Sequence, residues 1–214
     1  MDAGGHGYDL AGFRKAVAGI ALIDDPQLVR QRSRDFFWYS PILKAELNRK
    51  SADLVAVPKD QDEALRILGA CAQFRIPLVA RGGATGNYGQ LVPLHGGIVL
   101  DTEKLDRTLF IKPGVGRFEA GANLVSIDAQ ARKIGWELRM HPSTKRQSAL
   151  GGFVAGGAAG VGSAMLGQLR DWGSIPAVRV ATCENVPRVF DFRGRDVAAA
   201  THAYGTTGVL LEVE

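Results

Sequence analysis

The sequence predicts an α+β fold made of two α/β subdomains, preceded by a short helical segment. The first observation is a strand–helix–strand pattern that begins at Asp53. The second is a return to strand-like runs near the C-terminus. The third is a pair of glycine-rich passages that contain little to fill a hydrophobic core. A chain of 214 residues is long enough for one domain of two subdomains or for two small domains.

The N-terminal residues 1–50 are predicted to be helical and rather polar. The runs DLAGFRKAVAG and PILKAELNRK each place apolar residues three or four positions apart, which is typical of amphipathic helices. The aromatic run RDFFWYSP lies between them, and we expect it to pack on the main body. The sequence indicates no chemistry in this segment.

Residues 51–112 are predicted to form the first subdomain. The run DLVAVP indicates a buried strand that ends in Pro58, and DQDEALRILGACAQF indicates an amphipathic helix. Asp60 and Glu63 have the spacing of a capping box. The apolar stripe of this helix is expected to comprise Ala64, Leu65, Leu68, Cys71 and Ala72. The strands IPLVA and GIVLD follow, and a right-handed crossover implies parallel strands.

Residues 113–214 are predicted to form the second subdomain. GRFEAGA resembles a strand, and NLVSIDAQARKIG is predicted to be a helix capped by Asn123 and ended at Gly135. Further strands are expected in SIPAVRVATC, PRVFDF and GVLLEVE. The sequence contains no internal repeat and no disordered linker.

The composition is that of an ordinary globular protein, with 46% hydrophobic and 22% charged residues. No apolar run approaches the roughly 20 residues of a membrane-spanning helix, and no secretory signal is recognised. Cys71 and Cys183 have no metal-binding spacing, so we expect two small buried thiols and a cytoplasmic location. The net charge of +4 comes from scattered basic residues without a nucleic-acid motif, so a nucleic-acid partner is not expected.

Two glycine-rich passages remain, one between Leu78 and Asp101 and one between Ser148 and Gly162. Neither contains a P-loop or a complete Rossmann fingerprint. The residues leave three interpretations open. The glycines could serve turns and close packing, they could line a wet substrate channel, or their backbone amides could bind an anion. Side-chain donors for the anion interpretation are Thr85, Asn87, Ser143, Thr144 and Ser148.

The first passage, RGGATGNYGQLVPLHGGIVLD, resembles the pyrophosphate loop of FAD-linked oxidases and dehydrogenases of the vanillyl-alcohol oxidase superfamily, in the glycolate oxidase or D-lactate dehydrogenase branch. Ala84 replaces one glycine of the family pattern. HPSTKRQSALGGFVAGGAAGVGS is similar to the second FAD segment, although Gly157–Gly160 lacks the usual asparagine. The closing YGTTGVLLEVE also matches, so the resemblance covers residues 53 to 214.

The resemblance implies a PCMH-type FAD-binding fold, in which a small parallel βαβ subdomain and a larger, mainly antiparallel sheet with helices hold FAD between them. Non-covalent FAD is expected, because Ala84 and Thr85 stand where some members carry a flavin-linked histidine. No metal site is expected. The cofactor-binding residues that it implies are Arg81, Gly82, Gly83, Ala84, Thr85, Gly86, Asn87, Tyr88, Gln90, Pro142, Ser143, Thr144, Ser148, Gly151, Gly152, Ala155, Gly156, Gly160, Gly162, Gly208 and Val209.

The implied function is hydride transfer from a small substrate, such as a 2-hydroxy acid, to FAD and then to an unknown acceptor. Members of this family continue into a cap domain, so a missing cap domain or partner subunit is expected to complete the enzyme. The alternative is a redox-silent module that binds a flavin or another nucleotide. No catalytic residue and no oligomeric state are indicated. His95, His141 and His202 are expected to be structural or exposed, with His202 at a helix end. Arg81 either lies on the surface, or orders the loop or offsets phosphate charge.

Overall fold

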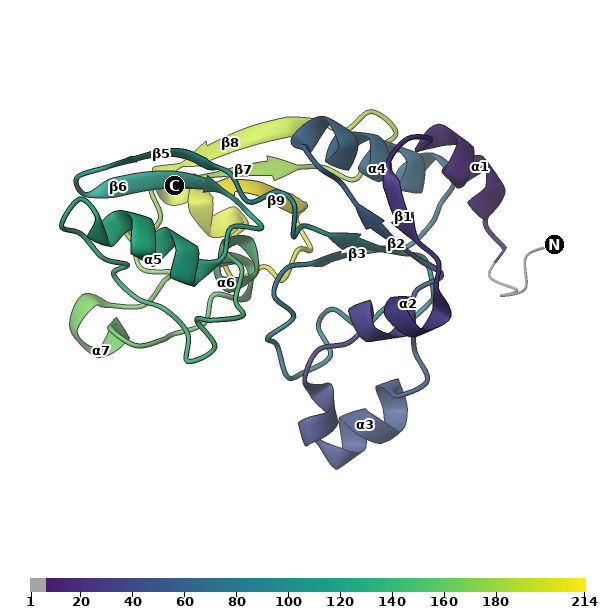
Figure 1. The fold of residues 1–214 in the computed structure, drawn as a ribbon, viewed down its shortest axis with the longest axis horizontal. Coiled ribbons are helices and arrows are strands. Elements are labelled where there is room, and N and C mark those ends of the chain that lie inside the picture. Colours follow the sequence, from purple (N-terminus) through teal and green to yellow (C-terminus); the bar gives the residue numbers. More distant parts are fainter. Residues whose placement is uncertain (1–6) are drawn as a thin grey trace. The chain divides into compact units, whose positions relative to one another are not determined.

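A computed structural model describes residues 7–214 of the chain (Figure 1). These residues divide into two compact units. Unit 1 comprises the described residues up to Lys104 together with Cys183–Arg188, and unit 2 comprises Leu105–Thr182 and Val189–Glu214. Each unit contains one β-sheet with helices, which confirms the predicted α+β class.

Unit 1 is built on a four-stranded sheet in the order β1-β2-β4-β3. β1 (Ala21–Ile23) is antiparallel to β2 (Leu54–Val57), whereas β2, β4 (Ile98–Asp101) and β3 (Leu78–Arg81) are parallel. Every residue of β2 and β4 is buried. The parallel direction was predicted, but β2 and β3 do not pair with each other because β4 lies between them.

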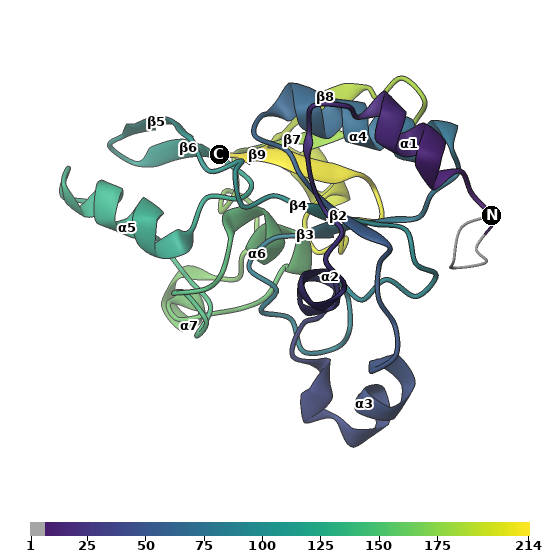
Figure 2. The same ribbon diagram turned by 45° about the vertical axis from the view of Figure 1, so that its right-hand side comes forward.

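Helix α4 (Gln61–Gln73) connects β2 to β3, as predicted. The Asp60 carboxylate accepts a hydrogen bond from the Glu63 amide at 2.9 Å, and the Glu63 carboxylate accepts one from the Lys59 amide. Glu63 therefore reaches one residue further back than in a capping box. The buried face of α4 differs slightly from the predicted stripe, because Ile67 and Ala70 are buried while Leu65 and Ala72 are half-buried. Figure 2 shows α1 (Leu10–Ala16) beside α4.

The N-terminal segment is less uniformly helical than predicted. It contains α1, α2 (Pro26–Arg32), the 3₁₀-helix η1 (Phe37–Tyr39) and α3 (Pro41–Leu47), but β1 interrupts them. The part of the prediction that falls on residues 1–6 lies outside the described residues. Strand β1 is only three residues long, so its sequence carries no clear alternation, and pairing with β2 defines it.

The aromatic run Phe36–Tyr39 was expected to pack on the main body, and only half of it does. Phe37 is fully buried and Phe36 is half-buried, whereas Trp38 and Tyr39 are exposed. A similar correction applies to the cysteines. Cys71 is buried on α4, but Cys183 is exposed.

Unit 2 is built on a five-stranded antiparallel sheet in the order β5-β6-β9-β7-β8. The strands are β5 (Thr108–Lys112), β6 (Val115–Glu119), β7 (Ala177–Ala181), β8 (Val189–Arg193) and β9 (Val209–Val213). Four of them lie in runs that the sequence marked as strands. The fifth, β5, was not predicted, and its half-buried pattern shows no regular alternation.

Helices α5 (Leu124–Arg132) and α6 (Leu150–Gly156) contribute to the core of unit 2 together with the sheet. The Asn123 side chain accepts from the Val125 amide at 2.9 Å, as expected of a cap, although α5 ends three residues before Gly135. The passage Ser148–Gly162 was expected to be a glycine loop, but about half of it forms α6. Two short helices, α7 (Ser163–Leu166) and the 3₁₀-helix η2 (Gly194–Ala199), complete the unit.

Candidate cofactor-binding site

The first glycine ribbon, which we define as residues 82–90, leaves the sheet of unit 1 at the carboxyl end of β3. Arg81 closes that strand, with its Nε donating to the Arg32 carbonyl at 3.1 Å and its Nη1 donating to the Gly82 carbonyl at 2.9 Å. The fully buried Asp101 carboxylate lies 2.5 Å from Arg32 and 3.4 Å from Arg81. Burial lowers the pKa of Arg81, and Asp101 opposes that change. Arg81 therefore orders the start of the ribbon and is not a free surface cation.

Most backbone N–H groups of the first ribbon have no protein acceptor. Within residues 7–214, five of them donate no hydrogen bond, namely those of Gly82, Gly83, Ala84, Gly86 and Asn87. The residues from Gly82 to Gly86 are half-buried, and an amide that is shielded from water is costly unless water or a ligand accepts its hydrogen bond. The first ribbon thus has the donors that an anion requires.

Peptide geometry shows how the first of these amides is oriented. In a trans peptide the N–H points opposite to the preceding carbonyl. Because the Gly82 carbonyl accepts from Arg81, the Gly83 N–H points away from that guanidinium. The guanidinium therefore fixes the direction of a donor that it does not itself contact.

A second peptide, at the far side of the ribbon, is oriented in the same way. The Gly86 carbonyl accepts from the Phe36 amide at 2.8 Å, so the Asn87 N–H points away from the N-terminal segment. Between these two fixed peptides, Ala84 has a φ of 55°, in the left-handed region. A left-handed residue within a turn directs successive N–H groups toward one point, which is the geometry of an anion-binding nest.

Asp35 holds the ribbon from the N-terminal segment. It is only 5% exposed, and its Oδ1 accepts from the Phe37 amide at 2.9 Å. Burial raises the pKa of Asp35, while the backbone N–H groups of Phe37 and of residues 89–91 face the carboxyl group and oppose that rise. Its Oδ2 closes no hydrogen bond among the described residues, and a Cβ at Gly86 would lie 3.3 Å from it. The described part of the N-terminal segment, residues 7–50, therefore does support the candidate site, contrary to expectation.

The end of the first ribbon is stabilised by its own side chains. Gln90 Oε1 accepts from the Tyr88 amide at 3.0 Å, so this predicted cofactor contact folds back on the loop. Tyr88 and Asn87 are exposed, and Thr85 is half-buried. Only a glycine fits at position 89, because φ is 79° there and a Cβ would lie 2.4 Å from the Leu47 side chain.

The second ribbon, defined as residues 141–162, lies in unit 2 and begins with a tight turn. The Pro142 carbonyl accepts from the Lys145 amide at 3.1 Å, and the Thr144 and Ser148 hydroxyls lie 2.9 Å apart. Ser148 also donates to the Thr144 carbonyl at 3.0 Å and is buried. These two hydroxyls therefore brace the turn, whereas Ser143 is exposed.

Asp128 on α5 anchors this turn, and the sequence reasoning missed it. Its carboxylate accepts from Lys145 Nζ at 2.7 Å, from Arg132 Nε at 2.9 Å and from the Leu138 amide at 3.0 Å. Burial alone would raise the pKa of Asp128, but these hydrogen bonds outweigh burial and leave the pKa well below its ordinary value. The four-residue spacing of Asp128 and Arg132 was the available signal.

Several glycines of the second ribbon are required by packing within unit 2. A Cβ at Gly151 would lie 2.6 Å from the Cβ of Ala120, and one at Gly160 would lie 2.2 Å from the His141 carbonyl oxygen. Gly162 has a φ of 100°, which a side chain would strain. These positions have a structural reason to be glycine whether or not a cofactor binds.

Other predicted positions are open instead. A Cβ at Gly152 or Gly156 would meet no described atom within 4 Å, and the two lie four residues apart on α6. The half-buried Ala155 lies between them. In contrast, Gly208 has a φ of 139°, and Val209 is buried at the start of β9, so both have structural roles.

The histidines show no catalytic arrangement. His95 is exposed, and His141 is half-buried with its Nδ1 at 3.1 Å from the Pro142 carbonyl oxygen. His202 has a φ of 59° and lies in a turn three residues after η2, not at a helix end as predicted. Within residues 7–214, no group of three or more His, Cys, Asp or Glu side chains could hold a metal ion. No helix in that range is long and apolar enough to cross a membrane.

A mainly parallel sheet with a ribbon of unpaired amides at its carboxyl edge, followed by an antiparallel sheet with a glycine-rich helix, is typical of a nucleotide-cofactor-binding domain. Comparison with protein families makes this class specific. Residues 52–184 match the family model FAD_binding_4, described as an FAD binding domain. The chain therefore belongs to this family.

Curated relatives place the chain among flavin oxidoreductases. It is 32% identical over 111 residues to glycolate oxidase subunit GlcD of Escherichia coli K12, a match that covers 50% of this chain and 22% of that protein. It is 32% identical over 120 residues to D-lactate dehydrogenase of Archaeoglobus fulgidus, covering 56% and 27% respectively. The chain thus matches only about a quarter of the length of these relatives.

Solved structures share the fold. An alkyldihydroxyacetonephosphate synthase aligns with a TM-score of 0.80 at 18% identity, covering 96% of this chain and 40% of that one. A BBE-like 1 variant from Physcomitrella patens aligns with a TM-score of 0.71 at 15% identity, covering 94% and 43%. These likenesses confirm the PCMH-type fold that the resemblance implied.

Proposed function

We propose that the chain is the cofactor-binding part of an oxidoreductase that transfers a hydride from a small substrate, such as a 2-hydroxy acid, to FAD. Electrons then pass to a further acceptor. Glycolate and D-lactate, which appear in the names of two relatives, are both 2-hydroxy acids. The observation that carries the proposal is the set of five unpaired amides on the first ribbon.

The first ribbon is assigned to the pyrophosphate of FAD. A pyrophosphate presents several anionic oxygens close together, and convergent N–H groups are a matching set of donors. The glycines leave these donors uncovered by side chains. Arg81 is committed to Arg32, Gly82 and Asp101, so its role is to fix the ribbon and not to contact the phosphate.

The second ribbon is assigned to the flavin and ribityl side. The open positions Gly152 and Gly156 leave a strip of α6 on which a flat ring system could lie without meeting a side chain. Pro142 and Ser143, in the turn that Asp128 anchors, would contact the same part of the cofactor. When bound, FAD supplies the hydride acceptor, and the protein supplies binding and orientation.

We propose that FAD is bound non-covalently, because the first ribbon contains no histidine and the nearest one along the chain is His95. A further domain or a partner subunit would provide the substrate contacts. The greater length of the relatives supports this part of the proposal, as does the name of one of them as a subunit. A cytoplasmic location stays a prediction from the cysteine pattern.

The test is titration of the purified chain with FAD, followed by flavin absorbance and thermal stability. Reversible bleaching of the bound flavin by dithionite separates a redox-active domain from the redox-silent module. Asp35→Ala is expected to weaken FAD binding about tenfold, because the loss of one buried acceptor that orders the ribbon costs about 1.4 kcal/mol. Asp106→Ala, at an exposed carboxylate, is the matched control. A wild-type chain that binds no FAD at high micromolar concentration would contradict the proposal.

A further inference from the structure

Unit 1 exposes three large apolar side chains on the segment formed by η1 and α3. Trp38, Tyr39 and Ile42, which we call the aromatic tip, are 43%, 68% and 76% exposed. The rings of Trp38 and Tyr39 stack with their centroids 4.1 Å apart. No residue of α3 is buried. Figures 1 and 2 both show α3 at the end of unit 1 far from α1 and α4. The described residues of unit 1 therefore leave the aromatic tip uncovered.

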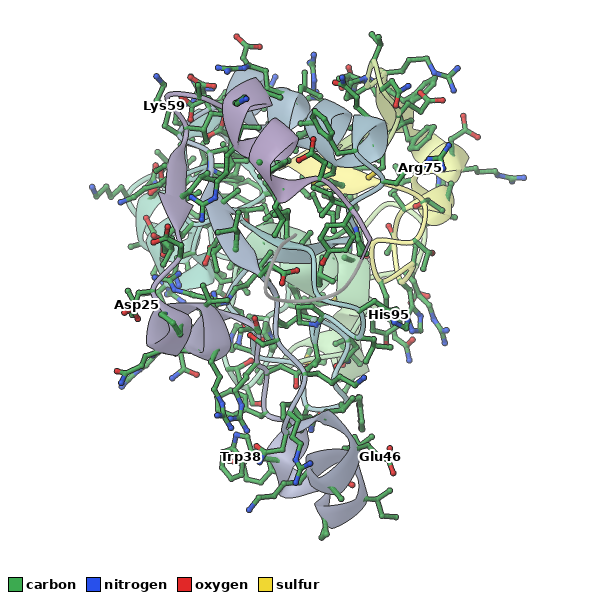
Figure 3. All side chains as sticks on the ribbon, turned by 90° about the vertical axis from the view of Figure 1, so that its right-hand side faces the viewer. Asp25, Trp38, Glu46, Lys59, Arg75 and His95 are labelled. Carbon is green, nitrogen blue, oxygen red and sulfur yellow. The ribbon has the colours of Figure 1, made fainter. Side chains whose placement is uncertain are left out.

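Basic residues are frequent in the segment that carries the aromatic tip. Five basic residues within positions 30–50 form no ion pair among the described residues, namely Arg30, Arg34, Lys44, Arg49 and Lys50. Glu46 is the one exposed carboxylate in the same range, and Figure 3 shows it on the opposite side of the segment from Trp38. The segment that carries the aromatic tip therefore combines exposed apolar side chains with an excess of positive charge.

We propose that the aromatic tip and these five cations dock unit 1 on an anionic lipid membrane surface. Tryptophan and tyrosine favour the boundary between lipid headgroups and hydrocarbon, because one end of each ring system is apolar and the other is polar. Clusters of about four to eight Lys or Arg residues beside such a segment bind anionic lipids. The long stems of Lys44 and Lys50 allow their ammonium groups to reach headgroups while apolar neighbours enter the interface.

A protein partner fits the same surface less well. A stable protein–protein interface buries about 800 Å² on each partner, and lysine is depleted from its core. The three side chains of the aromatic tip, on η1 and α3, offer less apolar area than that, and two of the five cations are lysines. Insertion into a membrane interface needs depth instead of a broad flat surface.

The test uses the purified chain with phosphatidylcholine vesicles, prepared with and without phosphatidylglycerol. We expect sedimentation with the phosphatidylglycerol vesicles only, with a blue shift of tryptophan emission, and weaker binding at high salt. Trp38→Ser with Tyr39→Ser should abolish the blue shift. Lys44→Gln with Lys50→Gln should weaken partitioning about 25-fold, because each basic residue near an anionic surface contributes about fivefold.

Matched controls come from unit 2. Trp172→Ser changes a tryptophan that is 80% exposed, and Lys133→Gln changes an exposed lysine outside the cluster, so both should bind as the wild type does. Circular dichroism of each variant checks that the fold is kept. The proposal is overturned if the wild-type chain does not bind anionic vesicles, if it binds neutral vesicles equally well, or if the control variants lose as much vesicle binding as the tip variants. It is also overturned if the tip variants instead abolish self-association without lipid, which would make a second copy the occupant.

Discussion

Replacement of Ala84 by glycine tests the conformation of the first ribbon directly. Ala84 has a φ of 55°, where an L-residue with a side chain costs about 1–2 kcal/mol relative to the right-handed region. Glycine removes that strain, but it adds about 0.4–1 kcal/mol of unfolded-state entropy that folding must overcome. The net expectation for Ala84→Gly is a gain of about 0.5–1 kcal/mol in the free energy of unfolding. For a chain of this size, the melting temperature should rise by about 1–4 °C.

The control is Ala80→Gly on β3, where the alanine is exposed and lies in an extended strand. That substitution should lower stability by about 0.5–1 kcal/mol, because no strain is relieved. Thermal unfolding monitored by circular dichroism gives both changes, and FAD titration should show no loss of affinity for Ala84→Gly, since the amide is kept. If Ala84→Gly destabilises the chain as Ala80→Gly does, the left-handed conformation of the ribbon is wrong.

Three further predictions concern other described positions. Gly151→Ala should destabilise unit 2 by about 1–3 kcal/mol, because its Cβ would lie 2.6 Å from that of Ala120. Gly152→Ala has open space on α6 and should raise stability by about 0.4–1 kcal/mol while weakening FAD binding. Asp128→Asn should cost about 2 kcal/mol at pH 7, measured by urea unfolding. The pKa of Asp128 is lower in the folded state than in the unfolded state. Its contribution to the free energy of unfolding is therefore complete above the ordinary carboxyl pKa of about 3.9 and is lost as the pH falls toward the folded pKa. The difference in unfolding free energy between wild type and variant should narrow only below about pH 4. Burial raises the pKa of the Cys71 thiol to about 12 and also raises the pKa of the more accessible Cys183, so a thiol reagent should modify Cys183 first and Cys71 only on unfolding; equal rates for the two would contradict the buried position of Cys71.

The sequence predicted the helices and strands whose signals depend only on residues nearby in the chain. Asp60 and Asn123 cap α4 and α5 as expected, because a cap depends only on the next three residues. The strands of the C-terminal region were found for the same reason, since short β-branched runs between turns identify them without tertiary information.

Features that depend on distant partners were not predictable in this way. β1 exists because β2 offers it an edge, and the position of β4 between β2 and β3 is a choice of topology that no local pattern records. Trp38 is a large aromatic residue of the kind that usually packs in a core, but its side chain lies on the surface.

The same limit applies to the candidate site. The sequence singled out glycines as a class, but it could not separate Gly151, which packing requires, from Gly152, which is open. Asp35 lies far along the chain from the ribbon that it supports, and its aromatic neighbours gave no sign of that role. The residues that shape the two ribbons are therefore harder to read from sequence than the ribbons themselves.

The strand order of unit 1 has a consequence for synthesis on the ribosome. β2, α4 and β3 leave the exit tunnel before β4, so β2 and β3 cannot yet join one sheet, because the strand that lies between them is translated only after the glycine ribbon. The nascent chain must therefore keep two unpaired strand edges apart until the ribbon has emerged. A deletion within the ribbon would misplace β4 as well as remove amide donors. The length of the ribbon is therefore constrained both by assembly of the sheet and by binding of the ligand.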